Sequence, residues 1–162
     1  MTQKPLYIFD GYNLIKRIDA LRREEIKSLE QGRQALLVHI ATFRNMTNHD
    51  AVVVFDGKKM SLQAKAGVRI LFSNLPNRAD EAIKRLVDDQ AKARTITVVS
   101  SDNEVMWYAQ GCGCRVERSE DFFQRLTTLK NKPVSDELSA KNDPSLSERE
   151  MDYWRSMFEH GE

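Results

Sequence analysis

Four aspartates carry the chemistry that this sequence suggests, and each lies close to an apolar run. Asp10 ends "LYIFD", Asp56 ends "AVVVFD", Asp102 follows "TITVVSS", and Asp80 stands in "RADEAI" after a further apolar run. Carboxylate oxygens are the ligands that hard divalent cations such as Mg2+ or Mn2+ prefer. Such an ion can activate water and stabilise the charge of a displacement at phosphorus. The acids therefore predict a metal-dependent hydrolytic site if the fold brings them together.

Each aspartate taken alone also has an ordinary structural role. Asp10 and Asp56 both precede glycine, and Asp-Gly is a frequent turn pair. Asp80 can stabilise a helix N-terminus through the helix dipole, and Asp102 can cap the helix that follows it. As a cluster, however, the acids repel and raise one another's pKa, which costs stability unless a cation neutralises them. The structural roles explain single residues better than they explain the set.

Several other catalytic and ligand motifs are missing from the sequence. It contains neither G-x-G-x-x-G nor G-x-x-x-x-G-K-[ST], which disfavours nucleotide binding of the Rossmann or P-loop kind. It contains no nucleophilic serine elbow, and its three histidines lack the spacing of metal ligands. The two cysteines of "GCGC" cannot complete a zinc site by themselves. Metal hydrolysis by carboxylates is the chemistry that remains.

The elements that must position these acids follow from hydrophobic patterning. Apolar runs rich in β-branched residues predict five strands, Leu6–Phe9, Ala51–Phe55, Val68–Phe72, Thr95–Ser100 and Arg115–Glu117. The second and fourth are continuously apolar, which is typical of parallel strands covered on both faces. Apolar stripes predict helices between them, Gln31–Met46, Arg78–Ala93, Asn103–Gln110 and Asp121–Leu129, with Trp107 in the core. This alternation predicts an α/β fold, in which the carboxyl ends of parallel strands share one edge.

Composition is consistent with one soluble domain. The chain has 162 residues, of which 41% are hydrophobic and 30% charged, as in ordinary globular proteins. Two cysteines close together exclude a disulfide framework, so we expect a reducing, cytoplasmic setting. The first apolar run is shorter than a signal peptide core or a membrane span requires. We therefore expect no membrane association.

Charge is distributed unevenly along the chain. Residues 1–130 hold 21 Lys/Arg and 16 Asp/Glu, a balance of +5, whereas residues 131–162 hold 4 and 8, a balance of −4. A basic body is compatible with a polyanionic ligand, although the charge alone is better explained by a solvated surface with a polar tail. A polar, proline-containing stretch separates the body from a final amphipathic segment with a capping box of Ser147 and Glu150. The expected divisions are a folded domain that holds the four acids, a linker and an amphipathic helix, at residues 1–130, 131–146 and 147–162.

Four motifs in this order, "IFDGYNLI", "VVVFDG", "RADEAIKRLV" and "VVSSDNEV", resemble the NYN domain and within it the YacP-like branch, which belongs with the PIN-like nucleases. The likeness spans residues 4–127. It implies a PIN-like three-layer α/β/α sandwich with a central parallel sheet, here followed by a C-terminal helical tail. It also implies a ribonuclease site that uses Mg2+ or Mn2+. Carried over by position, the acidic set is Asp10, Asp80 and Asp102, with Asp56 as a further metal ligand.

The same resemblance suggests residues that assist the acids. Asn13 matches the asparagine of the opening motif, and its amide could hydrogen-bond an acid or contact the scissile phosphate. Ser101 holds the small hydroxyl position beside the last acid, where it could orient Asp102 or a water. Glu81 is a supporting candidate that ranks behind Asp80, because adjacent helical residues point in different directions.

The leading hypothesis is a metal-dependent endoribonuclease that acts on single-stranded or structured RNA. We expect basic residues to hold the phosphate backbone, namely Arg33, Lys58, Lys59, Lys65 and Arg78. The alternatives are an RNA-binding module without significant turnover and a metal-dependent phosphatase or nucleotidase. DNA as the substrate also stays open, because no residue visibly reads a 2′-hydroxyl. Ribosome-associated RNA as a target and self-association through the C-terminal helix are further open possibilities.

Overall fold

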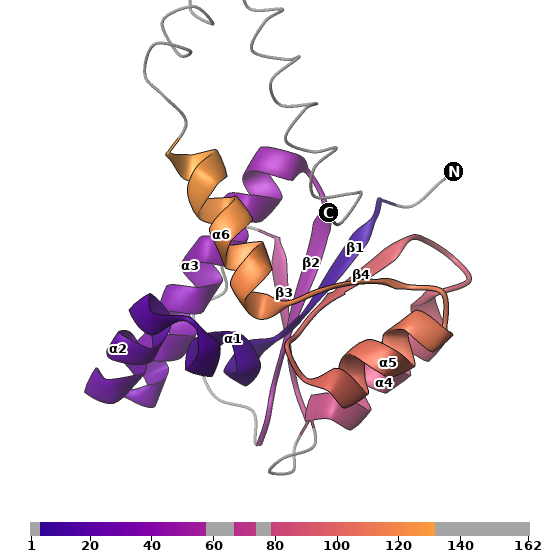
Figure 1. Ribbon diagram of the computed structural model, residues 1–162, viewed down its shortest axis with the longest axis horizontal. Helices are drawn as coiled ribbons and strands as arrows, with labels where there is room; N and C mark the ends of the chain where they lie inside the picture. Colours follow the sequence, from indigo (N-terminus) through magenta and orange to yellow (C-terminus); the bar gives the residue numbers. More distant parts are fainter. Residues whose placement is uncertain (1–3, 58–66, 74–78, 132–162) are drawn as a thin grey trace, which may run out of the picture.

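The computed structural model describes residues 4–57, 67–73 and 79–131 of the chain. Its centre is a five-stranded sheet in the order β3-β2-β1-β4-β5, and every pairing between neighbouring strands is parallel (Figure 1). The strands are β1 (Leu6–Asp10), β2 (Asp50–Phe55), β3 (Val68–Phe72), β4 (Ile96–Val99) and β5 (Arg115–Glu117). The parallel α/β fold expected from the sequence is confirmed.

Helices cover both faces of the sheet. One face carries α1 (Gly11–Arg17), α2 (Asp19–Lys27), α3 (Leu29–Thr47) and α6 (Ser119–Lys130). The other carries α4 (Ala79–Gln90) and α5 (Asn103–Gly111), as Figure 1 shows. The three-layer α/β/α sandwich is therefore confirmed, while the predicted linker and terminal helix lie almost wholly outside the described residues.

The central strands form because their side chains can be buried on both sides. All five residues of β1 are buried, and so are all four of β4. Successive side chains of a strand point to opposite faces. Tyr7 and Phe9 accordingly join the apolar cluster under α3 and α6, and Leu6 and Ile8 join the cluster under α4 and α5.

The position of β1 creates the place where a site can form. The chain leaves β1 through α1, α2 and α3 on one face to reach β2, and it reaches β4 through α4 on the other face. Where connections diverge to opposite faces, a crevice opens beyond the carboxyl ends of the strands. Asp10 is the last residue of β1 and thus lies at this crevice.

Two helices, α1 and α2, were not predicted. The first spans only seven residues, and the second buries only Leu21, so neither gives a clear apolar stripe. The Asp-Gly pair suggested that Asp10 starts a turn. Instead, Gly11 is the first residue of α1, so the chain passes from Asp10 directly into a helix. A Cβ at Gly11 would lie 2.5 Å from the Phe55 ring and 2.9 Å from the Val54 carbonyl oxygen. The glycine permits close packing of α1 on β2.

The assignment of Trp107 to the core was wrong. Its side chain on α5 is 69% exposed, whereas its neighbours Val105 and Ala109 are buried against the sheet. Among the helices of the described ranges, none has both the length and the apolar character that a membrane crossing needs.

Candidate active site

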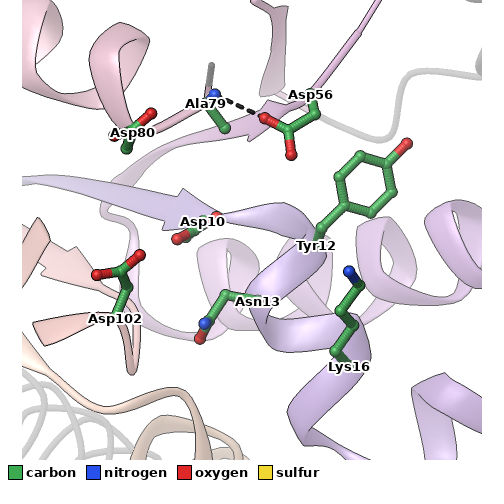
Figure 2. Close-up of a pocket in the computed structure, with 8 residues that line it drawn as sticks. All are labelled: Asp10, Tyr12, Asn13, Lys16, Asp56, Ala79, Asp80 and Asp102. Carbon is green, nitrogen blue, oxygen red and sulfur yellow. Dashed lines mark hydrogen bonds between the residues drawn. The ribbon is translucent and has the colours of Figure 1, made fainter. Parts of the chain in front are cut away.

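The four aspartates predicted from the sequence line one pocket at the carboxyl edge of the sheet. Asp10 ends β1, Asp56 follows β2, Asp80 lies in the first turn of α4, and Asp102 precedes α5. The pocket has a volume of about 300 Å3, and the residues that line it are Asp10, Tyr12, Asn13, Lys16, Asp56, Ala79, Asp80 and Asp102. Figure 2 shows the four carboxyl groups arranged around the same space. The fold thus brings together acids from four separate segments.

Asp10 is the most deeply placed of these acids. Its residue is only 9% exposed, and its Oδ2 accepts a hydrogen bond of 2.9 Å from the Ser100 hydroxyl. The pKa of Asp10 is raised from its ordinary value of 3.8 to about 6, mainly by burial, which the Ser100 hydrogen bond opposes and to which the nearby charges of Asp102 and Asp56 add. A carboxylate held in this way is electrostatically unfavourable and would be stabilised by a cation.

Asp56 connects the end of β2 to the start of α4. Its Oδ1 accepts a hydrogen bond of 2.6 Å from the backbone amide of Ala79 (Figure 2). Ala79 is the first residue of α4, so this bond fixes the helix N-terminus beside the pocket and places Asp80 on its rim. Gly57 follows with φ of 94°, a left-handed conformation that favours glycine. Asp56 is therefore both a structural residue and a member of the acidic set.

Asp102 caps α5. Its Oδ1 accepts a hydrogen bond of 2.9 Å from the Glu104 amide, as the capping interpretation of the sequence expected. Its own amide donates to the Ser100 hydroxyl at 3.1 Å. Capping fixes the side chain with one oxygen engaged, and the residue still lines the pocket.

Asn13 is held by its side-chain oxygen. Its Oδ1 accepts hydrogen bonds of 2.8 Å from the Ser101 amide and 2.8 Å from the Ser119 hydroxyl. Because the oxygen is engaged, the amide NH2 is the part of the Asn13 side chain that remains to act in the pocket. Asn13 is therefore suited to donate a hydrogen bond to an anionic group rather than to bind a metal.

Ser101 does not hydrogen-bond Asp102, which was one of the two partners suggested for it. Its hydroxyl hydrogen-bonds Glu120 and accepts from the Ser119 amide at 3.0 Å, and it makes no hydrogen bond to Asp102. The residue that joins the acids is Ser100, which the sequence reasoning missed, although it stands one position earlier in "VVSSD". Ser101 instead belongs to the group that holds Asn13.

The remaining predicted site residues, Glu81 and the basic residues, lie outside the pocket or outside the described residues. Glu81 is exposed and does not line the pocket. Arg33 is only 3% exposed, and its guanidinium lies over the rings of Tyr12 and Phe55 at 5.1 and 5.6 Å. The expectation that Arg33 contacts phosphate directly is therefore corrected, since it has almost no exposed surface. The other predicted phosphate-binding residues lie outside the described residues, namely Lys58, Lys59, Lys65 and Arg78.

Two pocket residues were missed at the sequence level. Tyr12 had no assigned role, and Lys16 was not considered, yet both line the pocket from α1. A helix beginning at Gly11 would have placed Tyr12 and Lys16 on one face, because residues four apart are neighbours on a helix. The short length of α1 concealed that signal.

The donor set fits a partly hydrated Mg2+ or Mn2+. Asp56 and Asp102 each engage one carboxylate oxygen, and no described residue hydrogen-bonds the second. Within the described ranges, no three Asp, Glu, His or Cys side chains lie close enough to hold one ion by themselves. Mg2+ commonly binds through one or two carboxylates and keeps several waters. The pocket suits that coordination better than a closed protein cage.

Comparisons with known proteins agree with the fold and the motifs. The family model described as the YacP-like NYN domain matches residues 7–159. The chain is similar to YacP of Bacillus subtilis (strain 168), with 25% identity over 132 residues, which are 78% of each chain. The crystal structure of Rae1 (YacP) from Bacillus subtilis is similar, with a TM-score of 0.69, 24% identity and coverage of 96% of this chain and 95% of that chain. A crystal structure of a point mutant of the same protein gives a TM-score of 0.71, 24% identity and coverage of 90% and 89%. The family match continues past residue 127, where the resemblance inferred from the motifs ended, and so includes most of the C-terminal segment.

Proposed function

The chain belongs to the YacP-like NYN domain family, and from this membership we propose that it is a metal-dependent endoribonuclease. The family suggests a nuclease-like function on RNA. The observation that carries the proposal is the convergence of Asp10, Asp56, Asp80 and Asp102 on one pocket. A binding module would gain nothing from four acids at the place where phosphate must dock.

In this proposal the acids share the work of holding the cation. Asp10 is buried at the base of the pocket, and Asp80 and Asp102 approach from the two helices on the other face of the sheet. Mg2+ or Mn2+, when bound, supplies an activated water and stabilises charge on the phosphodiester. Asn13 donates its amide hydrogens to a phosphate oxygen, because its carbonyl oxygen is engaged by Ser101 and Ser119.

The position of the pocket supports cleavage at internal positions of an RNA strand. The crevice lies at the open carboxyl edge of the sheet, between helices from the two opposite layers. An RNA strand can pass over such an edge and continue on both sides, so a free end is not required. This supports endonucleolytic rather than exonucleolytic action.

Cleavage of a labelled RNA tests the proposal. The full chain is incubated with Mg2+ or Mn2+, and the same assay is run on Asp10→Asn and Asp102→Asn. We expect each variant to lose activity by about 100-fold or more, as for other residues that stabilise developing charge. Asn also caps helices well, so Asp102→Asn should keep α5 intact. Asp89→Asn, an exposed acid of α4 outside the pocket, is the matched control. Full activity in both pocket variants, or in excess chelator, contradicts the proposal.

Metal binding gives a second readout that is independent of turnover. A ligand that binds only the folded state stabilises it by about 2.7 kcal/mol at 100 times its dissociation constant. Mn2+ should therefore raise the melting temperature of the wild-type chain and of Asp89→Asn, and should do so much less for Asp10→Asn. Equal stabilisation of all three proteins would show that the ion binds elsewhere.

The alternatives give different outcomes in the same experiments. Tight RNA binding with no cleavage in either metal would indicate a binding module. Hydrolysis of mononucleotides or phosphomonoesters without cleavage of RNA would indicate a phosphatase or nucleotidase. Cleavage of single-stranded DNA at a comparable rate would remove the restriction to RNA.

A further inference from the structure

The outward face of α1 carries two pocket residues that the acids do not account for. Tyr12 and Lys16 are four positions apart on this helix and both line the pocket. Figure 2 shows them side by side along α1, flanking the carboxyl groups. Because α1 begins directly after β1, the face that they share is fixed next to Asp10.

The Tyr12 ring is held from the protein interior. The guanidinium of the buried Arg33 lies over it at 5.1 Å from the ring centroid, and the Phe55 ring is 5.3 Å away. Arg33 also lies over Phe55 at 5.6 Å, so the three side chains form one cluster. The Tyr12 side chain is nevertheless only half-buried, and the residue lines the pocket. An aromatic surface that is already immobilised loses little conformational freedom when a ring stacks on it.

Lys16 differs in charge from the other pocket residues. Of the described residues that line the pocket, it is the one that carries a positive charge. It is exposed and forms no ion pair within 4 Å with any of the four pocket aspartates. Among the described residues, the four acids therefore do not hold its ammonium group, which can contact an anion that enters beside them.

We propose that Tyr12 and Lys16 form a nucleotide subsite, in which Tyr12 stacks on an unpaired base and Lys16 contacts the adjacent phosphate. The pairing of an aromatic surface with a cation is the usual arrangement for binding single strands. A base inside a duplex has both faces covered by its neighbours, so the subsite selects single-stranded segments or loops. This inference rests on the proposed function in one respect, namely that the neighbouring acids cleave a nucleic acid.

The subsite also gives Arg33 a role that its burial allows. The guanidinium cannot reach RNA, but it occupies one side of the Tyr12 ring and fixes its position. Arg33 is thus a positioning residue for Tyr12. A phosphomonoester without a base has nothing to stack on the cluster of Tyr12, Arg33 and Phe55. The cluster therefore distinguishes the subsite from the pocket of a general phosphatase.

Binding in excess chelator tests the subsite without cleavage. One probe is a labelled single-stranded oligoribonucleotide of about 12 nucleotides, within the site sizes of single-strand binders. The other is an abasic ribose-phosphate oligomer of the same length. Tyr12→Ala should weaken binding of the oligoribonucleotide about tenfold and leave the abasic oligomer unaffected. Tyr12→Phe should bind both probes like the wild type, since it keeps the ring.

Lys16→Met should weaken binding of both probes, because both contain phosphate. It should also reduce the slope of log K against log salt by about 0.7, the value for one phosphate contact on a single strand. Lys16→Arg should restore most of the affinity. Lys92→Met is the matched control. Lys92 is an exposed lysine that lies near the start of β4, at the amino ends of the strands and therefore away from the acidic pocket at their carboxyl ends.

Several outcomes overturn the proposal. Stacking is contradicted if Tyr12→Ala loses affinity for both probes equally, or if it loses affinity for neither. Tyr12→Leu, which keeps apolar volume for packing on Phe55, should reproduce the selective loss even if Tyr12→Ala is poorly folded. An unchanged salt slope in Lys16→Met contradicts the phosphate contact. The inference and the proposed function fail separately, since binding is measured without metal and cleavage with it.

Discussion

The buried hydroxyl of Ser100 donates a hydrogen bond of 2.9 Å to Oδ2 of Asp10. The same hydroxyl accepts a hydrogen bond of 3.1 Å from the amide of Asp102. One small side chain therefore links the acid that ends β1 to the acid that precedes α5. It also stabilises the charged form of Asp10 against the effect of burial.

Ser100→Ala should raise the pKa of Asp10 above about 6, because the hydrogen bond that lowers it is lost. A hydrogen bond to a charged group is worth about 1.5–3 kcal/mol, which corresponds to about one pH unit or more. The pH at which Mn2+ affinity falls by half should move upward accordingly, since the proton competes with the ion. Ser28→Ala, which removes the cap of α3, controls for general loss of stability. An unchanged pH midpoint would contradict the assigned role of Ser100.

Asp10→Asn should stabilise the metal-free chain at neutral pH. The folded pKa of Asp10 is about 6 against an ordinary value of 3.8, so between these values the folded state binds more protons than the unfolded state. Stability of the wild type therefore falls as pH rises through this window and stays lower above it. The variant lacks this titration and should gain up to about 3 kcal/mol above pH 6. Urea unfolding in chelator from pH 4 to 8 measures the difference.

Comparing the pH dependence of stability of the wild type with that of Asp10→Asn separates the effect of Asp10 from that of other titrating groups. Burial also raises the pKa of Glu117 to about 7, against the opposing effect of Arg125, 3.2 Å away. Glu117 should titrate alike in both proteins and cancel from the difference between them. Parallel stability curves for the wild type and Asp10→Asn would rule out the raised pKa.

Ser119→Ala should reduce catalytic turnover more than it reduces stability. Asn13 Oδ1 would lose one of its two hydrogen bonds, and the amide would be free to rotate away from the pocket. We expect kcat to fall about tenfold, with a stability cost of about 1 kcal/mol. Thr128→Ala, which removes an exposed hydroxyl from the same helix, is the control and should retain kcat. Wild-type kcat in Ser119→Ala would show that Asn13 needs no such support.

Gly11→Ala should destabilise the fold. The new Cβ would lie 2.5 Å from the Phe55 ring and 2.9 Å from the Val54 carbonyl oxygen, and the backbone of β2 cannot move aside cheaply. Overpacking of this kind costs about 1–3 kcal/mol. Gly111→Ala at the end of α5 is the matched control, because its Cβ would meet nothing within 4 Å. Equal melting temperatures for the two variants would contradict the close approach of α1 to β2.

The sequence predicted the sheet well because burial on both faces leaves a strong pattern. The predicted Ala51–Phe55 differs from β2 by one residue at its start, and Val68–Phe72 and Arg115–Glu117 match β3 and β5. Placing four acids on one edge followed from the parallel topology, which the structure confirms. Whether those acids bind metal stays a prediction.

The features that could not be predicted from the sequence were a short helix, the direction of single side chains and contacts between distant segments. The short α1 follows β1 without a break, so Lys16 could not be assigned to a helix face. Ser100 and Ser101 are adjacent and chemically identical, and only the direction of each side chain distinguishes the one that contacts Asp10. Arg33 looked like a surface cation because nothing in its own segment shows that Tyr12 and Phe55 enclose it.

The central position of β1 has a consequence for how the protein is made. Leu6 pairs with Asp50 on one side and with Ile96 on the other, so β1 is translated well before either of the strands with which it pairs. Asp102 comes later still, after β4 has ended. A growing chain therefore carries scattered aspartates and no assembled pocket until most of the domain has been synthesised. Products of incomplete translation that end before residue 96 would lack β4 and Asp102, and with them the complete acidic pocket.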